Sequence, residues 1–260
     1  DKMAKYKAIQ NAERLAINPD LFKDTITLNV TPRPEESKKI SDMLIGVFFE
    51  DINYGADGGL YAELVQIRDF EYSPNDIGRE ENWTATNSWS TGGEGLSFDI
   101  DTVAPLHAHN PHYAVLDIKE KGHGLVNDGF DGIPVKAGEK YDFSVFARST
   151  SNKRGKIIVR LLDEDGKVIG EARTGKISKT WNKLTAVVEA TDSAVNGRIE
   201  VIPGMEGEVN LDMVSLFPQK TFKNRKNGMR ADLAQAIADI RPRFVRFPGG
   251  CVAHGNGLDN

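Results

Sequence analysis

The sequence predicts an α/β fold combined with an all-β domain: the start of an incomplete (β/α)8 barrel with an inserted β-sandwich. Residues 44–50 (LIGVFFE) and 244–247 (FVRF) are apolar runs of strand length, which are typical of parallel strands covered on both faces. A segment with helical spacing of apolar residues lies beside each run along the chain. Between residues 73 and 218, short alternating runs separated by turn residues replace this pattern and indicate a β-sandwich.

Composition excludes several classes of protein. Of the 260 residues, 39% are hydrophobic and 27% are charged, which is typical of a globular protein. The formal net charge is -5, and Lys and Arg are interspersed with Asp and Glu, so no basic face for nucleic acid is expected. No window approaches the ~18 apolar residues of a spanning helix, so we expect no membrane partner. The single cysteine, Cys251, excludes an intrachain disulfide.

Residues 1–40 are predicted to contain a helix and one strand of a β-sandwich. Residues 1–20 have helix-forming composition, although their apolar stripe is weak. Residues 25–30 (TITLNV) alternate between apolar and polar side chains, as an amphipathic strand does.

Residues 41–72 are predicted to form the first β/α unit of the barrel. The strand at 44–50 is followed by a glycine-rich loop at 51–59 and by a helix at 60–70. The apolar positions of this helix that fall near one face are Leu60, Leu64, Ile67 and Phe70.

Residues 73–218 are predicted to form the inserted sandwich. The expected strands are residues 113–118, 140–148, 156–162, 167–170, 183–190, 197–201 and 209–217. Turn sequences such as Asp163-Glu164-Asp165-Gly166 separate them. Spacing alone leaves a jelly roll and an immunoglobulin-like topology open.

Residues 219–260 are predicted to form a second α/β unit, with a helix at 229–240 before the strand at 244–247. Pro242 ends this helix, because proline disfavours a helical residue before it. Two such units cannot close a barrel, which needs about 200–250 residues. We therefore expect the chain to be the N-terminal part of a larger protein.

Candidate site residues stand where the two apolar runs end. Glu50 ends the first run, and Pro248-Gly249-Gly250 follows the second, in which Arg246 is embedded. Loops at the carboxyl ends of parallel strands carry the chemistry of α/β folds. The glycines would let a ligand approach the backbone closely. The alternatives are a solvated glutamate, a simple tight turn, and an Arg246 that pairs with Glu50 or Asp51 because an unpaired buried charge is costly.

No metal site is predicted. His107, His109 and His112 lie in a proline-containing loop without the partners of a zinc site, so we interpret them as solvated or capping residues. Loop carboxylates leave a structural calcium ion in the sandwich open, and no other cofactor is expected.

Aromatic side chains in the sandwich region are candidates for stacking on sugar rings. Trp83 and Trp89 lie in a polar stretch (NWTATNSWS), and Tyr113 begins a predicted strand. Exposed rings there would contact the apolar faces of sugars. Trp181 opens another strand and is expected in the core.

Several separated motifs together resemble one enzyme family. Residues 46–53 (GVFFEDIN), 58–64 (GGLYAEL) and 246–251 (RFPGGC) resemble barrel motifs of α-L-arabinofuranosidases of glycoside hydrolase family 51. Residues 126–133 (VNDGFDGI) and 211–218 (LDMVSLFP) resemble the carbohydrate-binding-module-like jelly roll, of galactose-binding-like type, inserted in one branch of that family.

This resemblance implies a retaining, exo-acting hydrolase that removes arabinofuranosyl residues from arabinoxylan or arabinan. Such a mechanism needs two carboxylates about 5 Å apart, an acid/base and a nucleophile. Neither is expected in this chain, which should therefore be inactive alone. Glu50 matches a glutamate that binds sugar hydroxyls, and Cys251, beside Gly249 and Gly250, matches a position that lines the subsite.

Other properties stay open. The compartment is not determined by the sequence; because the chain begins with Asp and not Met, an upstream signal stays open, and a periplasmic or secreted protein is favoured over a cytoplasmic one. The resemblance leaves a homo-oligomer open. The alternative functions are a non-catalytic carbohydrate-binding module and a structural spacer.

Overall fold

The computed structural model describes residues 27–71 and 84–250 and divides the chain into two units, Asp1–Asp42 and Met43–Asn260. The described part of the first unit contains one short 3-10 turn, η2 (Pro34–Glu36). Leu28 and Val30 are 83% and 75% exposed, and residues 27–30 form no strand. The prediction of a strand at 25–30 is therefore wrong for residues 27–30. Alternation of apolar and polar side chains forms a strand only where a neighbouring strand supplies backbone hydrogen bonds. The helix predicted at 1–20 lies outside the described residues.

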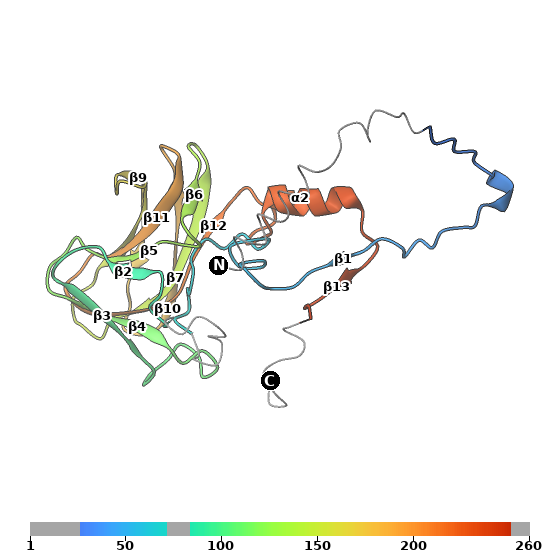
Figure 1. The fold of residues 1–260 in the computed structure, drawn as a ribbon. Coiled ribbons are helices and arrows are strands. Elements are labelled where there is room, and N and C mark those ends of the chain that lie inside the picture. Colours follow the sequence, from blue (N-terminus) through green and yellow to red (C-terminus); the bar gives the residue numbers. More distant parts are fainter. Residues whose placement is uncertain (1–26, 72–83, 251–260) are drawn as a thin grey trace, which may run out of the picture. The chain divides into compact units, whose positions relative to one another are not determined.

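The second unit is mostly β-sheet and contains a β-sandwich (Figure 1). One sheet has five strands in the order β10-β7-β12-β4-β3: Asn182–Glu189, Lys140–Arg148, Gly207–Pro218, Tyr113–Ile118 and Leu96–Asp101. The other has six strands, with the order β2-β5-β11-β8-β9: Trp89–Thr91, Leu125–Asn127, Ala194–Pro203, Lys156–Leu162 and Val168–Lys176; its sixth strand, β6 (Ile133–Val135), also pairs with β11. The pairs within both sheets are antiparallel.

Alternating side chains bring the two sheets face to face. In β7 the buried residues are Tyr141, Phe143, Val145 and Ala147, and in β8 they include Ile157, Val159 and Leu161; all belong to one apolar core. The bounds predicted for β4, β7 and β8 are confirmed. Strand β3 and the three-residue strands were missed; a stretch such as Leu125–Asn127, which is buried throughout, has no alternation to detect.

No helix forms at residues 60–70, which is a correction to the predicted first β/α unit. The backbone instead runs beside β12: the Leu64 N–H donates to Leu216 O at 3.0 Å, and the Val214 N–H donates to Arg68 O at 2.9 Å. Val65 and Phe70 then enter the sandwich core. Burial and pairing with β12 outweigh the helical spacing, as tertiary contacts commonly override local propensity.

A small parallel pair lies in the same unit. The strands β1 (Val47–Phe48) and β13 (Val245–Arg246) are joined in parallel, and α2 (Ala231–Ile240) precedes β13. A second 3-10 turn, η4 (Phe222–Asn224), connects β12 toward this helix. In the structure this helix begins at Ala231, two residues after the predicted start, and it ends at Ile240 as predicted. Arg241 then adopts the left-handed conformation before Pro242.

The expected burial of these strands is wrong for the described chain. Phe48 is 53% exposed and Val245 is 59% exposed, and Leu233 and Ile240 of α2 are also exposed. Each strand of this sheet has one strand partner among the described residues. No helix among residues 27–71 and 84–250 has the length and apolar character needed to cross a membrane.

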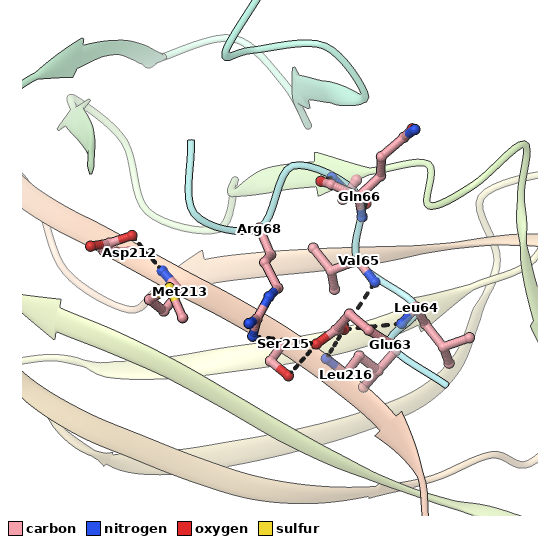
Figure 2. Close-up of polar contacts among 10 residues, drawn as sticks. Glu63, Leu64, Val65, Gln66, Arg68, Asp212, Met213, Ser215 and Leu216 are labelled. Carbon is pink, nitrogen blue, oxygen red and sulfur yellow. Dashed lines mark hydrogen bonds and ion pairs between the residues drawn. The ribbon is translucent and has the colours of Figure 1, made fainter. Parts of the chain in front are cut away.

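Glu63 joins the segment that leads into the sandwich to the strand that leaves it (Figure 2). Its carboxylate is 1% exposed, and Oε1 accepts hydrogen bonds from the N–H groups of Leu64, Val65 and Leu216 at 3.0, 3.1 and 2.9 Å. Ser215 Oγ donates to Oε2 at 2.5 Å, and Arg68 Nη1 lies 3.7 Å from Oε2. Burial raises the pKa of Glu63, whereas the hydrogen bonds from Ser215, Leu216 and Val65 and the charge of Arg68 act to lower it.

Further along both segments, the Ala62 N–H donates to Gly228 O at 3.2 Å, and the Arg230 N–H donates to Leu60 O at 2.9 Å. The incoming and outgoing connections of the sandwich therefore run side by side.

We predict that Glu63→Ala lowers the free energy of unfolding by at least about 2 kcal/mol, because it leaves buried N–H groups without acceptors. Urea unfolding followed by circular dichroism measures this loss. The matched control is Glu189→Ala, since Glu189 is 61% exposed and pairs with Lys140 at 3.6 Å. That change should cost less than about 0.5 kcal/mol. Equal losses in the two variants would contradict the role assigned to Glu63.

Candidate functional site

The carboxyl ends of β1 and β13 form one edge. Val47 pairs with Val245 and Phe48 with Arg246, and the Phe49 N–H donates to Arg246 O at 2.9 Å. Because the strands are parallel, the residues that follow both of them emerge on the same side. The structure thus places Glu50 and the bend at residues 248–250 together.

Glu50 lies directly against Gly249. A Cβ atom on Gly249 would stand 2.3 Å from Glu50 Cγ, and Gly249 is buried with φ at +123°. Only glycine allows both this backbone conformation and this approach. A Cβ atom on Gly250 would stand 3.9 Å from Glu50 Oε1, an ordinary contact. Cys251, the other residue predicted here, lies outside the described residues.

The loop after Glu50 folds back on itself. Asp51 Oδ1 accepts a hydrogen bond from the Ala56 N–H at 2.9 Å, and Asn53 and Tyr54 occupy the left-handed region with φ of 50° and 59°. Tyr54 then packs edge-on against Phe130 of the sandwich, with ring centres 5.3 Å apart. These contacts fix the direction in which the chain leaves the glutamate.

Arg246 is exposed, contrary to the expected burial. Its guanidinium lies 4.9 Å from the centre of the Phe48 ring, in a cation–π contact. The next residues along the chain, Phe49 and Phe247, stack their rings with centres 6.0 Å apart. The guanidinium of an exposed arginine beside the bend has N–H donors that a ligand can reach.

Two of the predicted stacking residues are structural. Trp89 is 7% exposed, its Nε1 donates to Ile67 O at 2.9 Å, and it packs on Phe70. Tyr113 is 2% exposed, and its hydroxyl donates to Asp101 Oδ2 at 2.9 Å. That hydrogen bond lowers the pKa of the Asp101 carboxyl group. Neither ring can stack on a sugar, so these two predictions are wrong. Trp83 lies outside the described residues.

A different aromatic–cation cluster was missed. Trp181, expected in the core, is half-buried, and the Arg148 guanidinium lies 4.7 Å from its ring centre and 5.2 Å from that of Tyr113. Arg148 Nη2 donates to the Tyr113 hydroxyl at 3.2 Å. The arginine at the end of an otherwise alternating strand is the sequence signal that could have indicated this cluster.

Two histidine side chains of the 107–112 loop form contacts within the protein. His112 Nδ1 lies 2.5 Å from Glu71 Oε2, and His107 Nδ1 accepts a hydrogen bond from the His109 N–H at 3.1 Å. Nearby, burial raises the pKa of Asp212 to about 7, and Asn110 donates a hydrogen bond to its Oδ2 at 3.1 Å. Within the described ranges, no group of three or more His, Cys, Asp or Glu side chains is arranged to hold a metal ion.

We predict that Gly249→Ala displaces Glu50, because the new methyl group would overlap the glutamate side chain and force a strained φ, at a cost of about 1–2 kcal/mol. Amide resonances of residues 49–51 in ¹⁵N–¹H spectra should move in this variant. The matched control is Gly250→Ala, whose methyl group meets Glu50 only at ordinary contact distance, and the same resonances should stay in place. Similar spectra for the two variants would contradict the close packing of Glu50 on Gly249.

Comparison with known proteins identifies relatives of this chain. Residues 62–208 match a family model described as a carbohydrate binding domain. The chain is 40% identical over 239 residues to an extracellular exo-α-L-arabinofuranosidase of Streptomyces chartreusis, covering 91% of this chain and 27% of that protein. It is 32% identical over 253 residues to α-L-arabinofuranosidase 1 of Arabidopsis thaliana, covering 92% of this chain and 36% of that protein.

Among solved structures, an arabinose-bound α-L-arabinofuranosidase of glycoside hydrolase family 51 aligns with a TM-score of 0.70 and 33% identity. The alignment covers 80% of this chain and 34% of that structure. This chain thus spans only about a third of the length of the relatives it matches. The chain belongs to the carbohydrate binding domain family, and its resemblance to the α-L-arabinofuranosidases of glycoside hydrolase family 51 is confirmed.

Proposed function

We propose that the chain supplies the sugar-holding side of the active site of a retaining, exo-acting α-L-arabinofuranosidase. The substrate would be a plant polysaccharide or oligosaccharide such as arabinoxylan or arabinan. The observation that supports this most is the position of Glu50, which packs on Gly249 at the shared carboxyl edge of β1 and β13.

The chemistry of this edge suits a furanose ring. A carboxylate accepts hydrogen bonds from several sugar hydroxyls, and the bare backbone of Gly249 and Gly250 lets the ring come close. Arg246 ends β13 beside the bend, and its exposed guanidinium would donate to ring or hydroxyl oxygens. Cys251 would line the same subsite. This chemistry needs no cofactor.

Hydrolysis would require carboxylates from outside this chain. A retaining glycosidase uses two carboxyl groups about 5 Å apart. We propose that neither the acid/base nor the nucleophile is among the described residues of this chain. We further propose that β1, α2 and β13, within residues 41–72 and 219–260, belong to a (β/α)8 barrel interrupted by a jelly roll at 73–218. The exposed apolar faces of Phe48 and Val245 favour this, because barrel strands are covered on both sides.

Secretion or export is part of this proposal, since the relative from Streptomyces chartreusis is named an extracellular enzyme. Homo-oligomerisation of the complete enzyme stays a prediction.

A second candidate function is non-catalytic carbohydrate binding by the sandwich. The half-buried ring of Trp181 under the Arg148 guanidinium favours it, together with the family match of residues 62–208. An aromatic ring and a guanidinium together can contact the apolar face and the hydroxyls of one sugar.

We predict that the 260-residue chain releases no p-nitrophenol from p-nitrophenyl α-L-arabinofuranoside, whereas L-arabinose shifts the amide resonances of Gly249 and Gly250. Glu50→Gln should weaken this binding about tenfold or more, because a charged acceptor of hydroxyl groups is lost. Glu206→Gln, an exposed carboxylate paired with Lys153 at 2.7 Å, is the control and should bind as the wild type does. Turnover by the pure chain, or an unchanged affinity in Glu50→Gln, would contradict the proposal.

For the second function, we predict that arabinoxylan oligosaccharides quench tryptophan fluorescence through Trp181. The response should vanish in Trp181→Leu and persist in Trp89→Phe, since the buried Trp89 ring faces the core. A wild-type chain that shows no response would leave the sandwich as a structural spacer.

A further inference from the structure

A cavity of about 530 Å³ is lined by four segments of the second unit and by neither Glu50 nor residues 248–250. These are residues 58–64, the segment around β6, residues 218–220 at the end of β12, and the start of α2. Ligand pockets commonly span about 300–1,000 Å³, so the cavity can hold one or two sugar rings. None of the residues predicted from the sequence as site residues lines it.

Three aromatic residues line the cavity, Tyr61, Phe130 and Tyr141, and the first two pack on neighbouring rings. Tyr61 packs edge-on against Phe217 with ring centres 5.1 Å apart, and Phe130 packs edge-on against Tyr54. Rings held in this way present apolar surface against which the C–H groups of a sugar can lie at little entropic cost.

The charged residues of the lining are balanced. Three are cationic and three are acidic: Lys136, Lys220, Arg230, Glu63, Glu139 and Asp232. Glu63 is occupied by backbone donors, and Arg230 is paired with Asp232 through two hydrogen bonds of 2.7 and 3.2 Å. With these groups engaged, Lys136, Lys220 and Glu139 remain, and together they offer both donors and an acceptor to a ligand that carries hydroxyl groups.

Glu139 is the group with unused capacity. Its Oε1 lies 3.6 Å from Lys136 Nζ and 3.7 Å from Lys220 Nζ, and both distances exceed a normal hydrogen bond. Its side chain is only 25% exposed, and within residues 27–71 and 84–250 these two ammonium groups are its ion-pair partners. One acceptor thus lies close to two ammonium donors without a direct hydrogen bond to either.

This pattern matches a vicinal diol. Each hydroxyl of a diol donates one hydrogen bond and accepts others, so neighbouring hydroxyls can donate to Glu139 and accept from Lys136 and Lys220. We infer that this cavity binds one neutral pentose unit through adjacent hydroxyl groups, as a second sugar site separate from the Glu50 bend.

Titration of the chain with L-arabinose, D-xylose or an arabinoxylan oligosaccharide tests this inference. Amide resonances of Gly132, Lys136 and Ala231 should shift with at least one of these sugars. A shift with the free pentoses indicates a monosaccharide pocket, whereas a shift with the oligosaccharide alone indicates a site for chain-linked sugar. Absence of any shift, or stronger binding of inorganic phosphate than of these sugars, would overturn the inference.

Substitutions of Glu139 and Lys220 test whether these side chains bind the sugar. Glu139→Gln and Lys220→Met should each weaken binding about tenfold or more, because each removes a charged hydrogen-bond partner. The matched control is Glu189→Gln, since Glu189 Oε2 also lies 3.6 Å from a lysine, Lys140, but lines no part of the cavity. Thermal unfolding confirms that the variants fold. Unchanged affinity in folded Glu139→Gln and Lys220→Met would overturn the inference.

The proposed role of Glu50 is measured separately, through the resonances of Gly249 and Gly250. Loss of binding at one site therefore leaves the signals of the other site unchanged, and the two proposals can fail independently.

Discussion

The buried carboxylate of Glu63 is the constraint on which the arrangement of the second unit depends. It accepts hydrogen bonds from the backbone of Leu64 and Val65, which lead into the sandwich, and from Ser215 and Leu216 in the strand that leaves it. A long insertion disturbs its host fold least when its two ends are close together, because the host chain then has no gap to close. Glu63 provides this closure with one side chain, and backbone pairs at Ala62 and Arg230 extend it.

The position of the candidate site follows from that closure. Once the two connections run side by side, β1 and β13 can pair in parallel although they lie far apart in sequence. Their carboxyl ends then meet, and the absence of a side chain at Gly249 allows Glu50 to pack on the bend. The cavity around Glu139 depends on the same closure, because its walls come from residues 58–64, from the sandwich and from the start of α2.

The sequence predicted most exactly the strands that alternate regularly between buried and partly exposed residues. Strands β4, β7 and β8 alternate between core and surface along their length, so their ends could be placed from the pattern alone. Residues 60–70 misled the prediction, since their apolar spacing is helical while their partners, in β12, are remote in sequence. Period-based reasoning detects local geometry and contains no information on which distant strand offers hydrogen bonds.

The candidate site shows the same division. Glu50 and the glycine bend could be indicated because each ends an apolar run, and parallel strands share an edge. The sequence could not distinguish buried from accessible aromatic residues. Trp89 is buried although polar residues surround it in the sequence, whereas Trp181 is half-buried although it directly precedes a predicted strand. Glu139 carries no local signal, because Lys220, one of its two lysine neighbours, is remote from it in the sequence.

Nuclear Overhauser contacts between the Glu50 side chain and Gly249 test the central claim most directly. If the closed connections bring the two strands into parallel register, the Glu50 γ protons should show strong contacts to the Gly249 α protons, accompanied by contacts between Val47 and Val245. Glu50 γ protons without any contact to Gly249, in a chain whose sandwich is folded, would contradict the account.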